Sequence, residues 1–359
     1  KDFGSGRGQM KSIKSASNYQ CKYHKGNNCQ ESQRMLRVED KKSSFFKACS
    51  FNCVYKQTKG RFLESQESVT NFPYFLTEAA FSGKITPRKF LVVDEAHNVE
   101  TELSKFIEMT VSKRFCKQVL KLSWPQKKTQ YSVFKWIRDE YFPKATARLL
   151  YFSQQLESMG LKSRIKDFAA LSKQFEMLSS HVKKMETFVK VYETDNWVLE
   201  VVPPKDRSLE KFVFRPIDVA PFAEQYVSRL GKRVLFMSAT ILDKETFCRS
   251  MGIKLEDTGF VSIPTPFPVE NRPVIFSSSG NMSAKTIDAT LPKMAKAVKM
   301  IMAEHSKEKG IIHCHTYKVA NYLKKNIKSR RLLVHNSENR DEVLQKHINS
   351  KTPTVLLSP

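Results

Sequence analysis

The sequence lacks any apolar run that approaches the roughly 20 residues of a membrane-spanning helix. No apolar core of a signal peptide follows Lys1, and the chain has no internal repeat or long low-complexity linker. These absences predict a soluble, intracellular protein without a membrane partner. We expect it in the cytoplasm of a prokaryote or virus-infected cell, or in a nucleus.

The sequence is also poor in acidic residues, with 36 Asp and Glu against 61 Lys and Arg and a formal net charge of +25. The basic residues are spread along the whole chain rather than confined to a tail. Such an excess favours a polyanionic partner, because each phosphate contact releases condensed counterions. Charge alone leaves open a merely soluble basic protein as the alternative.

The seven cysteines do not form the even, regularly spaced set of a disulfide scaffold. Four of them lie early, at Cys21, Cys29, Cys49 and Cys53, with the spacing C-x7-C-x19-C-x3-C. Structural zinc sites more often carry two short knuckles of closely spaced cysteines, whereas four unevenly spaced thiolates suit an iron–sulfur cluster. The spacing predicts a metal site and leaves zinc and iron–sulfur open.

The sequence pattern changes along the chain. The first 60 residues are rich in Lys, Ser, Gly and Asn and poor in apolar periodicity, so a staple such as a metal would have to hold their shape. From Thr101 to about Tyr192 the pattern is helical, with apolar residues at steps of three and four after a break at Gly160. This pattern predicts a helical hairpin or small bundle inserted between two halves of another domain.

The remainder of the chain is predicted to contain strands, which alternate with helices in its last part. Three are predicted at "NWVLEVVPP", "KFVFRPIDV" and "KRVLFMSATIL". After the proline-rich hinge "IPTPFPVENRP", strands and helices alternate in the order "VIFSSS", a helix near 291–305, "GIIHCHT", "VANYLKKNIK", "RLLVHN", "DEVLQKHINS" and "TVLLSP". Alternation of this kind with short turns predicts a parallel α/β sheet.

The stretch "KFLVVDEAHNVE" at 89–100 runs from an apolar strand into two carboxylates and a histidine. At the carboxyl end of a parallel strand, such side chains face the crevice where α/β sheets bind ligands. Phosphate-handling motors use one carboxylate there to hold Mg²⁺ through water and its neighbour to orient or deprotonate the attacking water. Asp94 suits the first role and Glu95 the second, while His97 could report the phosphate state to another segment. A strand that simply enters a solvated turn is the alternative.

A second predicted strand is followed by residues with small hydroxyl side chains. "VLFMSATIL" places Ser238 and Thr240 after an apolar run, where they could bond a carboxylate or histidine across the crevice. Alone, "SAT" is a common turn. Together with "DEAH" earlier in the chain, it predicts a second wall of the same site.

"VVDEAHN" and "MSATIL" resemble the second and third helicase motifs of superfamily-two nucleic-acid motors. With four cysteines before "DEAH" and a helical insertion after it, the chain resembles the XPD and DinG group of iron–sulfur DNA helicases. Further stretches resemble that group, in the family's order: "SNYQC" at 17–21, "NCVYKQTKGRFLESQESVTNFPYFL" at 52–76, "TPFPVENRPV" at 265–274, "GIIHCHTYKVA" at 310–320 and "TVLLSP" at 354–359.

The resemblance implies an α/β fold with RecA-like parallel-sheet motor domains, an inserted all-helical arch and a small cysteine-rich cluster domain. The implied ranges are 1–60 for the cluster domain, 61–104 and 205–263 for the two parts of the first motor domain, 105–204 for the arch, and 264–359 for an incomplete second motor domain.

The resemblance also implies the ligands. A 4Fe–4S cluster would be held by the four early cysteines, ATP would be the substrate together with Mg²⁺, and single-stranded and forked DNA would be bound by a monomer moving 5′ to 3′. Thr70 and Asn71, and Thr316 with Tyr317, would lie where DNA phosphates or bases are touched. Catalysis would rest on Asp94, Glu95, His97, Ser238 and Thr240.

The sequence departs from the family at both ends. It contains no G-x-x-x-x-G-K-[ST] loop, because "GSGRGQ" at 4–9 lacks the lysine and hydroxyl and "SGKI" at 82–85 lacks the glycine loop and hydroxyl. It also stops at Pro359, before the sixth motif. We therefore expect a central fragment of a longer helicase that does not turn over ATP by itself.

Two other functions remain open. A zinc- or cluster-stapled nucleic-acid-binding protein with a silent motor fold is the main alternative, although the intact "DEAH" and "SAT" argue against degeneration. An RNA motor is the third possibility, because "DEAH" also marks RNA helicases, but these lack the cysteine segment. The sequence does not decide the pathway, whether repair, replication restart, transcription or a viral process.

Overall fold

The computed structural model describes residues 10–24, 26–37, 40–51, 53–159, 165–204, 209–336 and 339–359. The chain divides into two compact units, Lys1–Val261 and Ser262–Pro359, and each is described here by itself. Two features noted in the sequence, the glycines at 4–9 and the helix break at Gly160, lie outside the described residues. Among the described helices, none is both long and apolar enough to cross a membrane.

The cysteine-rich segment is more helical than its composition predicted. Its elements are β1 (Lys11–Ile13), α1 (Cys29–Arg34), α2 (Ser44–Phe51) and α3 (Val54–Glu64). The Asn28 side chain and Glu31 form a reciprocal capping box that begins α1. Strand β1 pairs in parallel with β2 (Ser68–Thr70), which lies just before the motor elements. Local caps and a few buried apolar residues accompany these helices, although the sequence has little apolar periodicity here.

The first unit contains a two-stranded parallel sheet, in which β3 (Arg88–Val93) pairs with β7 (Gly231–Phe236). A Cβ on Gly231 would lie 2.7 Å from the Leu91 Cβ, so only glycine fits this close approach. The other elements of this region are α4 (Phe72–Thr77), α5 (Val99–Ile107), α10 (Ala220–Tyr226) and α11 (Lys244–Ser250).

Only one face of this sheet is covered. Val93 is buried, whereas Phe90 and Val92 remain 55% and 50% exposed. The sequence predicts an apolar strand here, and the burial of its residues alternates along the strand.

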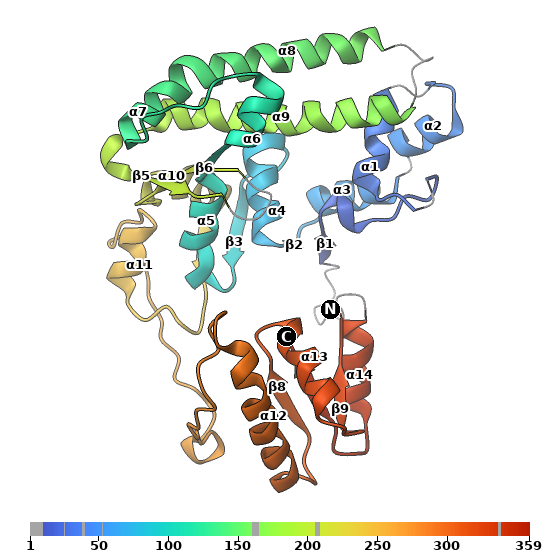
Figure 1. Ribbon diagram of the computed structural model, residues 1–359, viewed down its shortest axis with the longest axis vertical. Coiled ribbons are helices and arrows are strands. Elements are labelled where there is room, and N and C mark those ends of the chain that lie inside the picture. Colours follow the sequence, from blue (N-terminus) through green and yellow to red (C-terminus); the bar gives the residue numbers. More distant parts are fainter. Residues whose placement is uncertain are drawn as a thin grey trace. The chain divides into compact units, whose positions relative to one another are not determined.

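The inserted region is dominated by α6 (Lys113–Phe115), α7 (Gln130–Trp136), α8 (Phe142–Ser158) and α9 (Ile165–Val191). Helices α8 and α9 run side by side as a hairpin, as Figure 1 shows in green. Before the inserted region, β2 leads into α4, which has Asn71 as its N-cap.

The insertion is not all-helical, which corrects the expectation from the sequence. Strands β4 (Met109–Ser112) and β5 (Trp197–Val202) lie within 105–204 and pair antiparallel with β6 (Lys211–Pro216) in the order β4-β6-β5. Met109 and Val111 are fully buried, so one face of this four-residue strand belongs to the core. The helical pattern of the surrounding sequence gives no sign of the strand. Aromatic rings close this core, and Trp124 stacks on Phe212 at 4.3 Å between centroids.

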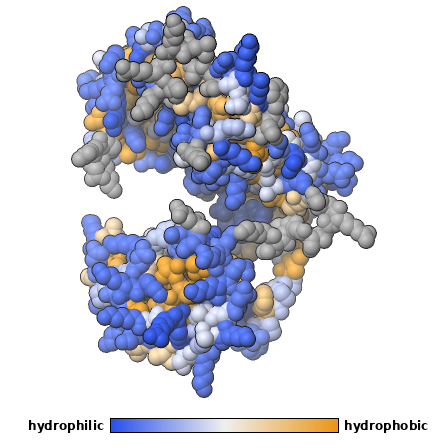
Figure 2. Space-filling model, turned by 90° about the vertical axis from the view of Figure 1, so that its right-hand side faces the viewer, coloured by the Kyte–Doolittle hydropathy of each residue, from blue (hydrophilic) through white to orange (hydrophobic). Residues whose placement is uncertain are grey.

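The second unit is a three-stranded parallel sheet in the order β8-β10-β9. Its elements are α12 (Ile287–Glu304), β8 (Gly310–His313), α13 (Tyr317–Asn326), β9 (Leu332–Val334), α14 (Arg340–Asn349) and β10 (Val355–Ser358). The predicted alternation of strands and helices is confirmed for these six elements. On the face of the molecule in Figure 2, hydrophilic residues predominate and an apolar patch lies on this unit.

The strand predicted at "VIFSSS" does not form. Val274, Ile275 and Phe276 are 93%, 89% and 93% exposed, so they pair with no strand and bury no face. Strand propensity is realised only where a segment pairs and packs, and these apolar residues do neither.

Candidate nucleotide and metal sites

The acids of "DEAH" lie at the carboxyl end of β3, beside the carboxyl end of β7. The backbone N–H of Met237 donates to the carbonyl of Val93 at 3.0 Å, and the N–H of Ala96 donates to the carbonyl of Met237 at 3.0 Å. These two bonds extend the β3–β7 pairing past the strands. The loops that carry "DEAH" and "SAT" are thereby held next to one another.

Glu95 adopts a left-handed backbone conformation, with φ 50° and ψ 43°. This region is uncommon for a residue with a side chain and costs conformational energy. The Glu95 N–H donates to the Asp94 carboxylate at 2.9 Å, and the Glu95 carbonyl accepts from Asn98 at 3.0 Å, which holds the turn. Both carboxylates project from this turn on exposed residues, where a ligand can reach them.

His97 joins the two loops through its side chain. Its Nδ1 lies 2.8 Å from the Ser238 hydroxyl and 3.4 Å from Oε2 of Glu95. Ser238 in turn lies 3.2 Å from the Thr240 hydroxyl and accepts the Thr240 N–H at 3.1 Å. The structure thus brings together Glu95, His97, Ser238 and Thr240 in one chain of polar contacts. These contacts connect the "DEAH" loop to the "SAT" loop.

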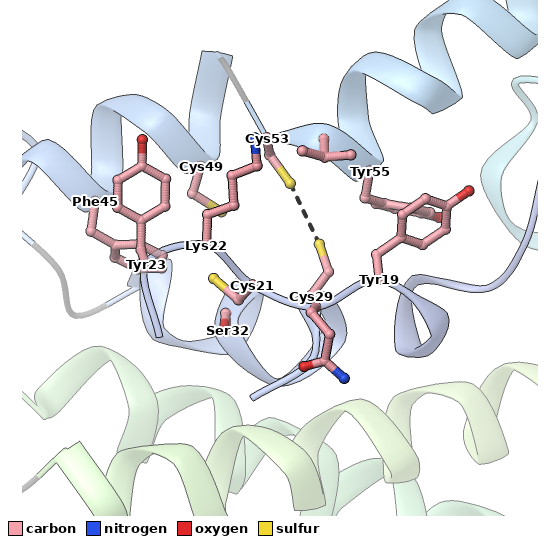
Figure 3. Close-up of a pocket in the computed structure, with 12 residues that line it drawn as sticks. Tyr19, Cys21, Lys22, Tyr23, Cys29, Ser32, Phe45, Cys49, Cys53 and Tyr55 are labelled. Atoms are coloured by element: carbon pink, nitrogen blue, oxygen red, sulfur yellow. Dashed lines mark hydrogen bonds between the residues drawn. The ribbon is translucent and has the colours of Figure 1, made fainter. Parts of the chain in front are cut away.

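The four early cysteines line a single pocket, with their side chains directed into it in Figure 3. Cys29 begins α1, Cys49 lies in α2, and Cys53 is the N-cap residue of α3. Cys21 lies before α1, and its backbone N–H donates to the Asn27 carbonyl. The sulfurs of Cys29 and Cys53 are 3.5 Å apart. Within the described ranges, however, no three His, Cys, Asp or Glu side chains are placed to hold a single metal ion.

The thiols of this pocket differ in acidity because of their surroundings. Burial, together with the neighbouring Cys53 and Cys49, raises the pKa of Cys29 to about 12. Burial also raises the pKa of Cys49, against the opposing charge of Lys56. Burial of Cys21 is outweighed by hydrogen bonds such as that from the His24 N–H, so its pKa is lowered. Crowded thiolates of this kind need a positive group between them before all can be deprotonated.

A polar network that the sequence did not reveal ties the cysteine segment to α4 and the π-helical turn Glu78–Ser82. Lys59 on α3 donates to both Glu78 oxygens at 2.7 Å, and Tyr55 and Tyr74 share a hydrogen bond of 3.1 Å. Burial alone would raise the pKa of Glu78, but the hydrogen bond from Lys59 and further hydrogen bonds lower it. Tyr55 also lines the cysteine pocket, so the network reaches from that pocket to the π-helical turn Glu78–Ser82.

The cysteine segment also contacts the inserted helices. Arg34 at the end of α1 donates through Nε to Glu176 of α9 at 2.8 Å. No local signal marks either this pair or the Lys59 pair, because both join residues that only the tertiary fold brings together.

The four residues expected to touch nucleic acid divide between the two units. In the first unit, the Thr70 hydroxyl donates to the Ile13 carbonyl at 3.1 Å, and Asn71 caps α4 by accepting the Tyr74 N–H at 2.9 Å. In the second unit, Thr316 caps α13, and Tyr317 begins that helix with its ring 47% exposed. Thr70, Asn71 and Thr316 thus have local structural partners, and Tyr317 offers an exposed ring.

The chain is similar to solved structures of XPD helicases. One, described as "XPD_Helicase", has a TM-score of 0.44 and 14% identity and covers 99% of this chain and 67% of that chain. Xpd4 of S. tokodaii has a TM-score of 0.37 and 14% identity, covering 83% and 64%. A third, "XPD_APO", has a TM-score of 0.39 and 15% identity, covering 84% and 62%. The chain therefore spans about two thirds of the length of these structures, which belong to the helicase group named from the sequence motifs. No protein-family model and no curated protein sequence matches the chain.

Proposed function

We propose that the chain is the central part of an ATP-dependent DNA helicase that moves 5′ to 3′ on single-stranded DNA. The observation that carries this proposal is the hydrogen bond between His97 and Ser238. It joins the loop after β3 to the loop after β7, at the edge of the sheet where α/β proteins bind ligands. A nucleotide-dependent motor needs such a link, because hydrolysis at one loop has to be sensed by another segment.

The proposed roles follow from position. Asp94 would hold Mg²⁺ through water, and that ion would neutralise charge on the phosphates of ATP. Glu95 is exposed on the strained turn and would orient or deprotonate the attacking water. His97, Ser238 and Thr240 would pass the state of this site to the "SAT" loop through their contacts.

The cysteine pocket fits a 4Fe–4S cluster held by Cys21, Cys29, Cys49 and Cys53. Four thiols from four separate segments line it, and four thiolates are the donor set of such a cluster. A zinc ion would need all its ligands within about 2.3 Å of one point, whereas a cluster fills a wider space. The cluster would cross-link α1, α2 and α3 and so fix this segment against α9 and α4.

The proposed partner is single-stranded or forked DNA. The net charge of +25 and the exposed Tyr317 ring support contact with phosphates and bases. Two parallel-sheet units, each carrying part of the motif set, are suited to a motor that closes on ATP and reopens after hydrolysis.

The test is Glu95→Gln in the full-length protein, compared with Glu100→Gln in α5 as a matched control. We expect DNA-stimulated ATP hydrolysis to fall at least about 100-fold for Glu95→Gln, the size of a lost general base, with DNA binding kept. The control should hydrolyse ATP at the rate of the wild type. Hydrolysis left intact by Glu95→Gln would remove the catalytic assignment.

A nucleic-acid-binding protein with a silent motor fold is the second candidate, because the net charge of +25 favours a polyanionic partner with or without hydrolysis. Wild-type full-length protein that binds DNA without any DNA-stimulated hydrolysis would select this candidate. Unwinding of RNA but not DNA duplexes would instead select an RNA motor.

A further inference from the structure

A second pocket lies away from both candidate sites, between the inserted region and the motor helices of the first unit. It is lined from α9, α5, α10, the first residue of β5 and the π-helical turn Glu78–Ser82. Its cavity volume is about 140 Å³, and its mouth is open to solvent. An apolar cavity of about 150 Å³ holds a benzene molecule, so one aromatic ring fits here and the rest of a ligand would lie in the mouth.

The charged residues that line this pocket all have the same sign. They are Lys183, Lys184 and Arg229, and no Asp or Glu belongs to the lining. Lys184 is only partly exposed, and its burial lowers the pKa of its ammonium, against the favourable influence of Glu108. Glu108 itself lies 3.1 Å from the Arg215 guanidinium, to which it is paired. In the described chain Lys184 therefore forms no ion pair of its own, although burying a cation without one is unfavourable.

The wall of the pocket is aromatic. Phe106 of α5 and Tyr226 of α10 line it and meet edge to face, 5.4 Å between ring centroids. Phe188 of α9 also lines the pocket and meets Trp197 edge to face, 4.9 Å between ring centroids. Trp197 is 1% exposed, and its Nε1 has no hydrogen-bond partner among the described residues. A buried donor of this kind normally has an acceptor, which the protein does not provide here.

We propose that this pocket binds a small molecule that carries an anionic group on a planar aromatic ring. The Lys184 ammonium and the Arg229 guanidinium would meet the anion, and Phe106, Phe188 and Tyr226 would enclose the ring. Arg229 is already fixed on one side, because its Nε donates to the carbonyl of Gln225. A polar atom on the ligand would accept the Trp197 N–H.

A ligand in this pocket would link the inserted region to the rest of the first unit. It would contact α9 of the insertion and α5 and α10 of the motor region at once. Binding would therefore stabilise the packing of the insertion on the motor and raise the midpoint of thermal unfolding with ligand concentration. This inference does not depend on the proposed helicase activity.

The experiment compares two fluorescent probes on the whole chain: 8-anilinonaphthalene-1-sulfonate, an aromatic anion, and N-phenyl-1-naphthylamine, which has nearly the same rings but no charge. We expect saturable binding of the anion and a loss of about tenfold in its affinity for Lys184→Met, the usual size of a lost charged contact. The neutral probe should bind Lys184→Met and wild type alike. Lys190→Met is the matched control, because Lys190 lies on the same helix outside the pocket and pairs with Glu186.

A second variant tests whether the anion binds in this pocket rather than on other apolar surface of the protein. Ala80→Trp places a large side chain in the lining, so we expect it to remove about one bound anion per chain. Circular dichroism and the unfolding midpoint would show that each variant is folded. Equal anion affinity for Lys184→Met and Lys190→Met, or tighter binding of the neutral probe than of the anion to wild type, would overturn the proposal.

Discussion

The cysteine pocket and the edge of the β3–β7 sheet differ in how completely the described chain builds them. The pocket has walls from three helices and a preceding turn, and all four thiols face it. The sheet edge has two loops joined by His97 and Ser238, but its acids are exposed and the sequence contains no phosphate-binding loop to complete it. The comparison teaches that the cysteine pocket gathers its whole proposed donor set in one place, whereas the sheet edge presents exposed acids held by contacts between two loops.

The two sites also differ in how firmly the structure around them is held in place. Phe90 and Val92 leave one face of the β3–β7 sheet uncovered, although parallel sheets normally bury both faces. The cysteine segment is anchored twice, through Lys59 to Glu78 and through Arg34 to Glu176. Variants at the pocket and its anchors should therefore have large effects on structure, and variants at the sheet edge should have small ones.

The largest effect is expected for Cys49→Ser. Removing one of four thiolates should reduce the metal content of the purified chain from about four irons to near zero and expose the cysteine segment to protease. Cys248→Ser in α11 is the matched control, since this buried cysteine lies outside the pocket and should leave the metal content unchanged. Metal content that stays the same in Cys49→Ser would remove the cluster assignment.

The next largest effect is expected for Lys59→Met. The side chains of Lys59 and Glu78 are only 18% and 13% exposed, so the change leaves a carboxylate buried without its partner. We expect a loss of about 3 kcal/mol in the free energy of unfolding, measured with denaturant. The double variant Lys59→Met with Glu78→Met should recover most of it, because no unpaired charge remains.

The same pair gives a test by pH. The pKa of Glu78 is lowered in the folded state, so its contribution to stability is complete above the unfolded value of about 4.5 and is lost as the pH falls below it. Wild type should therefore lose stability relative to the double variant as the pH is lowered from 5 toward about 3. A constant difference across this range would mean that the pair does not contribute.

The smallest structural effect is expected for Ser238→Ala. Its hydrogen bond to His97 joins exposed residues, so we expect a loss of less than about 1 kcal/mol in the free energy of unfolding. Thr246→Ala in α11 is a suitable control, since its side chain lies outside the "SAT" loop. A loss of several kcal/mol would show that this contact supports the fold rather than signalling between loops.

The parts that the sequence predicted are those in which local pattern and motif agree. The strands before Asp94 and before Ser238 and the six elements of the second unit all carry their signal within about ten residues. The adjacency of "DEAH" and "SAT" followed from parallel pairing, which brings strand ends to one edge.

The parts that the sequence could not predict depend on distant partners. Strand β4 pairs with β6, about a hundred residues later, and its Met109 and Val111 are fully buried. The segment at Val274–Phe276 has strong strand propensity and yet finds no partner. Lys59 and Glu78 are two of many charged residues, and nothing local indicates that the fold brings them together.

The most direct test of the central claim is the visible absorption spectrum of the anaerobically purified chain, with iron, acid-labile sulfide and zinc measured on the same sample. We predict a brown protein with about four irons and four sulfides per chain, as expected when Cys21, Cys29, Cys49 and Cys53 hold a cubane cluster. A colourless protein with one zinc per chain would contradict it, and the silent nucleic-acid-binding protein would then become the better description.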